Sequence, residues 1–177
     1  MMEDLSLHIL DIAENSIEAK ARRVAIRVEE LISKDRLVLE ISDDGRGMSP
    51  RKLARALDPF FTTKKAKRIG LGLPLLAQAA RAAGGKVTLR SGPGRGTRVR
   101  ATFRLGHIDL QPLGDIAETL TVLMVAHPDV NFRYTHKTDA GSYVFRSHSS
   151  GAPARPRNIA EIKKDIRSGI VRIRRKS

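Results

Sequence analysis

The first strong pattern along the chain is that of an amphipathic helix. Apolar residues recur at intervals of three and four, the spacing that places side chains on one face of an α-helix. This apolar arc consists of Leu5, Ile9, Ile12, Ala13, Ser16 and Ile17. The opposite arc is polar and consists of His8, Asp11, Asn15 and Glu18. Asp11 and Asn15 are therefore expected to point in the same direction.

The following segments alternate or run apolar in the way that strands do. "RVAIRVEELI" and "RLVLEIS" predict two paired strands with a turn at Lys34 and Asp35 between them. "KVTLRS" and "TRVRATFRL" predict a hairpin around the turn "GPGRG". Two helices lie between these strand pairs: a short one in "SPRKLARAL", and a longer one in "GLPLLAQAARAAG" that ends at two glycines. Residues 1–106 are thus predicted to form a two-layer α/β sandwich.

The remaining residues are less regular. "PLGDIAETLTVLMVAH" predicts a helix, and "NFRYTHK" with "SYVFRSH" predicts a hairpin. We expect residues 107–150 to form a small α/β extension and residues 151–177 to form a basic linker and tail. The linker is "SSGAPARPR", and residues 155–177 carry nine Lys or Arg against Glu161 and Asp165, a net charge of +7. The tail "NIAEIKKDIRSGIVRIRRKS" is compatible with a helix over part of its length. A solvated or disordered tail is the favoured interpretation, and contact with nucleic acid is the alternative.

Composition indicates a folded protein with a mainly aliphatic core. The chain has 177 residues, of which 41% are hydrophobic and only 4% aromatic. It contains no run of the ~18 apolar residues that suggest a membrane span, and acids occupy the start where a secretory signal carries basic residues. It also has no cysteine, which excludes disulfides and fits a reducing compartment. We expect a cytoplasmic protein.

The net positive charge of the chain indicates an anionic partner but does not identify it. Lys and Arg number 33 against 19 Asp and Glu, which gives a net charge of +14. Such an excess attracts nucleic acid, an acidic protein face, a nucleotide or an anionic membrane.

Three short stretches bear on chemistry, although each has a plain structural explanation when taken alone. "ISDDGRGM" places Asp43 at the end of an apolar strand, followed by Gly45 and Gly47. "DPFFTTKK" puts two aromatic residues beside threonines and lysines. "IGLGLPLL" opens a helix with glycines, where free backbone amides can cradle a phosphate.

Taken in order with the first helix, these stretches resemble the four boxes of the GHKL ATP-binding superfamily. That superfamily includes DNA gyrase, heat-shock chaperones, histidine kinases and mismatch-repair ATPases. The resemblance covers residues 1 to about 106, and it implies a GHKL-type sandwich with ATP and Mg²⁺ as ligands.

The resemblance assigns roles to individual residues. It implies that Asn15 coordinates Mg²⁺, and an amide oxygen suits this hard cation. It implies that Asp43 accepts a hydrogen bond from the adenine amino group, that Gly45 and Gly47 give the base room, and that Thr97 helps to hold the adenine end through water.

The phosphate-binding turn is matched by Gly70, Leu71 and Gly72, and the lid before it carries Lys64 and Lys65. The lid is short and basic, and Arg68 stands near the place where kinases often have a further glycine.

Asp11 bears on turnover. Gyrase-like and repair ATPases have a glutamate four residues before the Mg²⁺ asparagine as their general base, and here that position holds the shorter Asp11. Hydrolysis is therefore expected to be slow or to need a partner. Glu14 and His8 are neighbouring alternatives for the general base. Glu14 is expected to be solvated or to support the site from a second layer. His8 fits a structural hydrogen bond as well as it fits a part in catalysis.

Function stays open between several classes. Only seven residues precede His8, so we expect a stand-alone module without a phosphoacceptor-histidine hairpin. The leading interpretation is a regulatory ATP module, either a slow ATPase switch or a histidine-kinase-like protein kinase acting on a separate protein partner. The alternatives are a nucleotide sensor without turnover and a nucleic-acid-associated ATPase.

Overall fold

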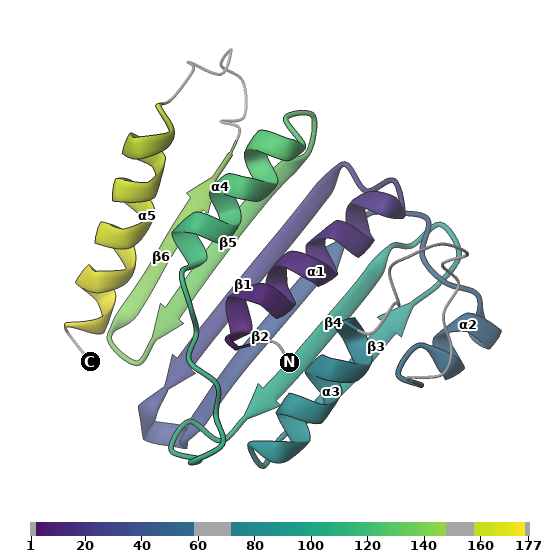
Figure 1. Ribbon diagram of the computed structural model, residues 1–177, viewed down its shortest axis with the longest axis horizontal. Helices are drawn as coiled ribbons and strands as arrows, with labels where there is room; N and C mark the ends of the chain where they lie inside the picture. Colours follow the sequence, from purple (N-terminus) through teal and green to yellow (C-terminus); the bar gives the residue numbers. More distant parts are fainter. Residues whose placement is uncertain (1–2, 59–71, 148–157, 176–177) are drawn as a thin grey trace.

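A single mixed sheet of six strands organises the molecule (Figure 1). The computed structural model describes residues 3–58, 72–147 and 158–175. The strand order across the sheet is β3-β4-β2-β1-β5-β6. The strands are β1 (Arg23–Leu31), β2 (Arg36–Asp43), β3 (Lys86–Ser91), β4 (Thr97–Phe103), β5 (Asn131–Thr138) and β6 (Gly141–Arg146). The helices are α1 (Leu5–Glu18), α2 (Pro50–Arg55), α3 (Gly72–Ala82), α4 (Ile116–Ala126) and α5 (Ile159–Arg174), with a short 3₁₀ turn at Ile32–Lys34.

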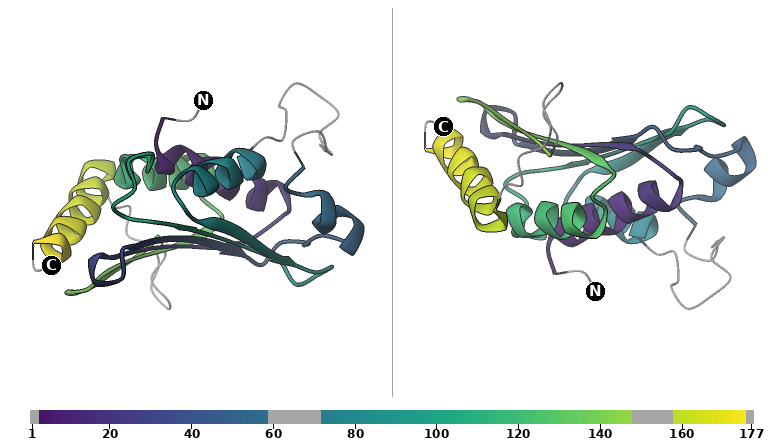
Figure 2. Two further views of the ribbon diagram at one scale, coloured as in Figure 1. Left: turned by 90° about the horizontal axis from the view of Figure 1, so that it is seen from below. Right: turned by 90° about the horizontal axis from the view of Figure 1, so that it is seen from above.

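Within the described ranges, the helices packed on this sheet cover one of its faces. Figure 2 shows α1, α3 and α4 side by side on the same side of the curved strands. Side chains alternate across a strand, and in β1 Val24, Ile26 and Val28 face the helices and are buried. The predicted two-layer α/β sandwich is therefore confirmed. Among the helices of the described ranges, none is both long and apolar enough to cross a membrane.

Helix α1 lies across the middle of the helical layer. Its N-terminus is capped by Asp4, whose carboxylate accepts a hydrogen bond from the Leu7 amide at 3.1 Å. Leu5, Ile9, Ile12 and Ala13 from the predicted apolar arc are all buried. Burying this arc against the strands leaves Asp11 and Asn15 partly accessible on the helix.

One residue of the predicted polar arc does not face solvent. His8 is only 1% exposed, because the segment that follows β4 passes over the start of α1. In that segment Gln111 lies 3.2 Å from the imidazole, and the Pro112 carbonyl accepts a hydrogen bond from the Leu5 amide at 2.9 Å. Burial lowers the pKa of His8 despite opposing contributions from Gln111 and Asp11.

The region after residue 107 continues the same sheet. Strand β5 pairs in parallel with β1, from Arg23 opposite Asn131 to Glu30 opposite Thr138. The expected hairpin is present, with β6 returning antiparallel to β5. Phe132 and Tyr134 of β5 are fully buried under the helices, so the predicted extension shares its hydrophobic core with the first half of the chain.

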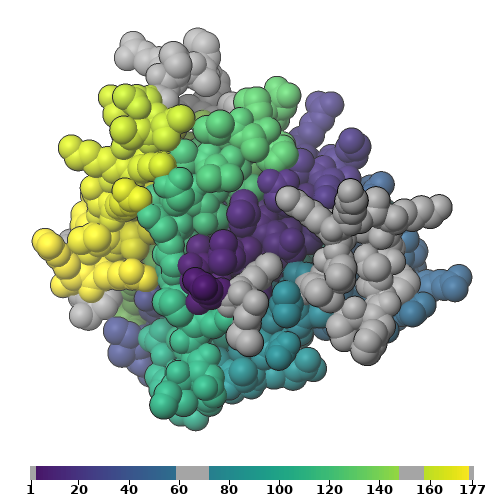
Figure 3. Space-filling model, in the orientation of Figure 1, coloured from purple at the N-terminus to yellow at the C-terminus, as the bar shows by residue number. Residues whose placement is uncertain are grey.

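The expectation of a solvated or disordered tail is wrong for residues 159–174. These residues form α5, which packs against α4 and β6 (Figures 1 and 3). Ile166, Ile170 and Ile173 are buried at spacings of four and three. Because apolar residues recur among the basic ones, the segment is an amphipathic helix, which its net charge concealed.

Part of the basic charge of α5 is used for docking. Lys163 lies 2.6 Å from Glu118 and Arg167 lies 2.6 Å from Asp115, both at the start of α4. Arg174 at the other end lies 2.6 Å from Glu30 of β1. These contacts hold the helix at three points along its length.

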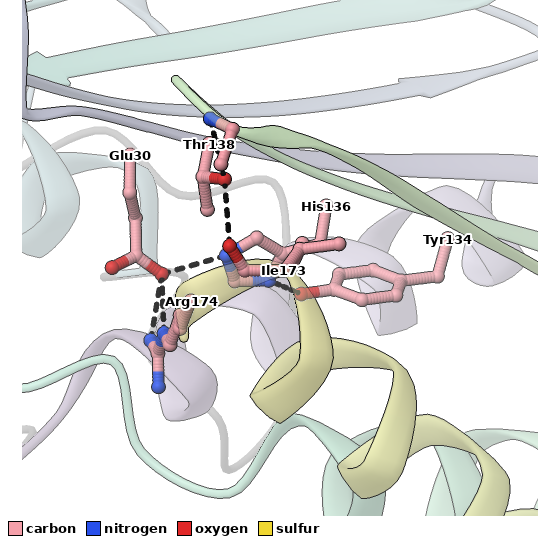
Figure 4. Close-up of polar contacts among 7 residues, drawn as sticks. Glu30, Tyr134, His136, Thr138, Ile173 and Arg174 are labelled. Atoms are coloured by element: carbon pink, nitrogen blue, oxygen red, sulfur yellow. Dashed lines mark hydrogen bonds and ion pairs between the residues drawn. The ribbon is translucent and has the colours of Figure 1, made fainter. Parts of the chain in front are cut away.

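Glu30 connects α5 to a buried polar chain (Figure 4). Its carboxylate lies 2.6 Å from Nε2 of His136, whose Nδ1 lies 2.6 Å from the Tyr134 hydroxyl. The Thr138 hydroxyl also donates to the Ile173 carbonyl at 3.1 Å. Burial acts to raise the pKa of Glu30, but hydrogen bonds from His136 and Arg174 outweigh it and lower that pKa.

This cluster makes stability depend on Glu30 in acid. Because the folded pKa of Glu30 is lowered, its contribution is present above the unfolded value and is lost as pH falls through the folded value. We expect Glu30→Gln to reduce the free energy of unfolding at pH 7 by about 1.5–3 kcal/mol, and by less at pH 3. Denaturant titrations at both pH values measure this, with Glu3→Gln, an exposed carboxylate, as control. An equal loss at both pH values would contradict the role of the charge.

Candidate functional site

Asp43 lies where β2 ends and is held from three directions. Its Oδ2 accepts a hydrogen bond from the Ser16 hydroxyl of α1 at 2.7 Å. Its Oδ1 accepts from the amides of Gly45 at 2.8 Å and Thr97 at 3.2 Å. A carboxylate oxygen can accept two hydrogen bonds, so Oδ2 keeps one lone pair for a further donor. The carboxylate is thus fixed in direction and still able to accept.

The glycines after Asp43 let three backbone segments approach one another. Gly47 has φ of +68°, and a β-carbon there would overlap the Gly92 carbonyl in the turn between β3 and β4. Gly96 has the same φ, and a β-carbon there would overlap the Asp43 carbonyl. Gly45 lies against Ala19 at the end of α1. In this structure the glycines allow close backbone packing around Asp43. This role is additional to the space that Gly45 and Gly47 are expected to leave for an adenine base.

Thr97 belongs to the same network. Besides its amide bond to Asp43, its hydroxyl lies 2.9 Å from the Ser91 hydroxyl. Ser91 also accepts from the Met48 amide at 2.8 Å and donates to the Gly96 carbonyl at 2.8 Å. The hairpin of β3 and β4 is therefore fastened to the loop after β2.

Asp11 and Asn15 lie together beside the N-terminus of α3. The Asn15 amide donates to Oδ2 of Asp11 at 3.3 Å. A β-carbon at Gly72, the first residue of α3, would overlap the Asp11 carboxylate. This close approach needs a glycine, and it places the Asp11 carboxylate, with the Asn15 amide bonded to it, beside the first turn of α3. A helix start favours anions.

Helix α1 joins these two groups because Asn15 and Ser16 are consecutive. The Ser16 hydroxyl donates to Asp43 at the end of β2, while the Asn15 amide donates to Asp11, which lies against α3. Asp43 and Thr97 therefore lie beside the last turn of α1, which holds Asn15 and Ser16, while Gly72 lies against Asp11 one turn earlier.

Other acidic residues nearby have structural tasks. Glu14 lies 3.0 Å from Nε2 of His127 at the end of α4, which ties α1 to its neighbouring helix. Asp44 accepts from the amides of Arg22 and Arg23, each at 2.8 Å, and pairs with the Arg23 side chain. Burial acts to raise the pKa of Asp44, but the contacts with Arg23 lower it overall. Of the two neighbouring aspartates, only Asp43 faces the helical layer.

Several predicted site residues lie outside the described residues. These are Lys64, Lys65, Gly70 and Leu71, together with the "PFFTTKK" part of the second stretch. Their roles stay predictions.

The oxygen ligands of Asp11 and Asn15 fit Mg²⁺ only if the ion is also bound by phosphate oxygens of a ligand. Asn15 and Asp11 offer neighbouring oxygen ligands, yet within the described ranges no three histidine, aspartate or glutamate side chains gather into a metal site. Mg²⁺ usually keeps several waters and takes one or two protein ligands plus phosphate oxygens. The residues present therefore suit an ion that arrives with a phosphate ligand.

Two residues of this site were not singled out from the sequence. Ser16 looked like a small residue of the apolar arc, and Ser91 like the end of a strand. The hydroxyl among the apolar positions of the first helix was the one available signal, since a buried hydroxyl requires a partner.

Comparison with known proteins identifies the family. Residues 3–107 match the sequence profile of the "Histidine kinase-, DNA gyrase B-, and HSP90-like ATPase" family. The chain belongs to this family. The predicted GHKL resemblance is thereby confirmed, and residues 3–107 form an ATPase-type domain homologous to the ATP-binding domains of histidine kinases.

Similar curated proteins of this family are bacterial sensors. The chain is 44% identical over 110 residues to "Sensor protein kinase FleS" of Pseudomonas aeruginosa, which covers 62% of the chain and 27% of that protein. It is 35% identical over 89 residues to "Sensor histidine kinase ZraS" of Salmonella typhimurium, which covers 50% of the chain and 19% of that protein. The chain thus matches only about a quarter or less of the length of these relatives.

Similar solved structures extend the likeness of fold past residue 107. "Aquifex aeolicus MutL ATPase domain complexed with ADP" superposes with a TM-score of 0.52 at 14% identity, covering 95% of this chain and 70% of that one. "Crystal Structure of N terminal domain of a DNA repair protein" gives 0.56 at 15% identity, covering 91% and 56%. The C-terminal strands and helix are therefore included in the shared fold.

The geometry around Asp43 yields a prediction for nucleotide binding. We expect Asp43→Asn to weaken ATP by about one to two decades, because a charge-assisted hydrogen bond contributes roughly 1.5–3 kcal/mol. Isothermal calorimetry with ATP measures the change.

The matched control is Asp44→Asn, one residue along the chain, because Asp44 binds the start of β1. Its ATP affinity should equal that of the wild type. Equal affinities for all three proteins would remove Asp43 from the nucleotide site.

Proposed function

We propose that this chain is an ATP-driven regulatory module that binds ATP with Mg²⁺ at the end of α1. Adenine would lie at Asp43, Gly45, Gly47 and Thr97. The phosphates would lie at the start of α3, where Gly72 is described and Gly70, Leu71, Lys64 and Lys65 are expected to contribute. The observation that carries the proposal is the fixed Asp43 carboxylate, held from α1, from its own loop and from β4 with one lone pair left over.

The two ends of the proposed site recognise different parts of the ligand. Asp43 requires a donor, which the amino group of adenine provides and the carbonyl of guanine at the same position does not. The α3 start favours negative charge. Selection of base and of phosphate is thus assigned to separate elements, both positioned by α1.

Asn15 is proposed as the protein ligand of Mg²⁺. The bound ion would neutralise phosphate charge and orient the phosphate chain. Asn15 brings no charge of its own, so it can approach both the ion and the carboxylate of Asp11. This arrangement makes Mg²⁺ affinity depend on the nucleotide.

Asp11 is proposed as the residue that promotes turnover. Its carboxylate is directed by the Asn15 amide and lies against the start of α3, which is where the phosphates are proposed. A carboxylate within hydrogen-bond reach of a water or a partner's nucleophile can accept its proton. The neighbouring Glu14 is engaged with His127, and His8 is buried, so both are weaker candidates than Asp11.

The output is proposed to be either phosphotransfer to a separate protein or slow ATP hydrolysis. The names of the similar curated proteins, which are sensor kinases, favour the first, and the likeness of fold to a MutL ATPase domain is compatible with the second. A nucleotide sensor without turnover is the alternative. The cysteine-free sequence supports placing this activity in a reducing compartment such as the cytoplasm.

Substitution of Asn15 tests the metal. We expect Asn15→Ala to lose the enhancement of ATP binding by Mg²⁺ and any Mg²⁺-dependent turnover, while ATP binding in EDTA stays the same, because the side chain is partly exposed and outside the apolar arc. Calorimetry with and without Mg²⁺ measures this. Glu18→Ala, an exposed residue one turn later, should behave as the wild type. Full Mg²⁺ dependence in Asn15→Ala would place the ion elsewhere.

Substitution of Asp11 separates the possible outputs. If Asp11 is the general base of hydrolysis, Asp11→Asn should lower phosphate release about 10²–10⁴-fold and change ATP affinity only a few-fold. Incubation with γ-labelled ATP, alone and with cell extract, measures both release and transfer. Glu14→Gln is the matched control on the same helix.

Each result has one meaning. Loss of hydrolysis with retained binding supports an ATPase that uses Asp11, and label on a second protein supports a kinase. A wild-type protein that binds ATP without release or transfer supports the sensor. Hydrolysis that is unaffected by Asp11→Asn would contradict the proposed role.

A further inference from the structure

The sheet face opposite the helices carries a row of arginines that spans the strands. Cross-strand pairing places Arg90 opposite Arg98, Arg98 opposite Ser42, Ser42 opposite Ala25, Ala25 opposite Arg133, and Arg133 opposite Arg146. Each of these six strands contributes one residue to the row. The paired side chains point to the same face, and the residues on either side of them along the strands, such as Val99, Ile41 and Tyr134, face the helices and are buried.

The four arginines of this row, Arg90, Arg98, Arg133 and Arg146, are exposed and form no ion pair with any part of the chain that the structure describes. The small side chains of Ser42 and Ala25 separate them into two pairs. Between the pairs lies a shallow hollow of about 410 Å³, lined also by Arg23, Asp43 and Asp44, of which Arg23 and Asp44 are paired with each other. Like charges opposite one another weaken a sheet, so the row costs stability unless an anion covers it.

The neighbouring rows show that this arrangement is specific. Two residues further along the strands, Arg100 is paired with Glu40 and Arg27 with Glu29. Among the described strands, the arginine row therefore places unpaired, exposed charges of one sign opposite one another, whereas both arginines of the next row are paired with glutamates.

We propose that this open face, centred on the arginine row, binds the phosphate backbone of a nucleic-acid duplex. The charge extends across the whole width of the sheet, which matches an extended polyanion better than a compact one. Arginine offers a planar fork of donors that suits phosphate. The aromatic residues of β5 and β6, Phe132, Tyr134, Tyr143 and Phe145, all lie in the core, so the described face has none on which single-stranded bases could stack.

The sequence had directed attention to the C-terminal segment as the basic region, but three of its basic residues pair with acids of the body. Among the described residues, the sheet face carries four unpaired arginines in one row, whereas the exposed basic residues without an ion pair in and just after α5 are Lys164, Arg172 and Arg175. The hollow within the row reaches Asp43 of the proposed nucleotide site, so duplex binding is measured without nucleotide.

Fluorescence anisotropy with a labelled 24-base-pair DNA duplex tests this proposal on the full chain. If about four phosphates are contacted, the slope of log affinity against log salt should be about −3.6. Arg133→Gln with Arg146→Gln should reduce the slope by about 1.8 and weaken binding about ten-fold or more at 0.1 M salt. The melting temperature should stay equal or rise, because two opposed like charges are removed.

The matched control removes the same charge from α5 by Arg172→Gln with Arg175→Gln, and we expect its affinity and slope to equal those of the wild type. An equal loss in both double variants, or a loss in the α5 variant alone, would overturn the proposal. So would a wild-type protein that fails to bind the duplex at 50 mM salt, or one that binds vesicles of phosphatidylcholine and phosphatidylserine (3:1) in its place. A single strand of the same length should bind more weakly than the duplex, and tighter binding of the single strand would also contradict the assignment.

Discussion

The structure depends on a sheet that the described helices cover on one face. Every strand must present apolar side chains to the helices at alternate positions, and the positions between them must tolerate water. The helical layer needs a central member that is apolar toward the strands along its whole length, and α1 fills this place with Leu5, Ile9, Ile12 and Ala13. Because α1 is fixed in this way, its remaining polar side chains have defined directions.

The site proposed for ATP follows from the position of α1. A serine within its apolar face reaches Asp43 at 2.7 Å, and the residue before it contacts Asp11 beside the start of α3. Glycines at positions 47, 72 and 96 remove the side chains that would separate these segments. Rigid packing and the proposed ligand recognition thus involve the same few residues, and the close backbone approach directs the polar groups to one place.

On the other face of the sheet, the alternate strand positions carry polar and charged side chains in place of apolar ones. Along β5, Phe132 and Tyr134 are buried while Arg133 between them is exposed. Parallel pairing of β5 with β1 then aligns Arg133 with residues of β2 and β4 that are distant in sequence. The high net charge of the chain is consequently not spread evenly, and the basic residues of α5 serve in part to attach that helix to Asp115, Glu118 and Glu30.

The sequence alone determined the two-layer architecture and the joint direction of Asp11 and Asn15, because helical and strand periods are local properties that a single segment displays. The family followed from the resemblance of four short stretches, which are also local. The sequence did not determine that His8 is buried, since the covering residue Gln111 lies 103 positions away in the chain. Nor did it show that a basic C-terminal segment packs as α5, because net charge hides an apolar stripe whose partners, α4 and β6, are found only in the fold. Tertiary structure likewise decided the hydrogen bond of Ser16 to Asp43 and the alignment of four arginines across the strands. Hydrogen bonds and strand register join residues that are distant in sequence, and no local pattern relates them.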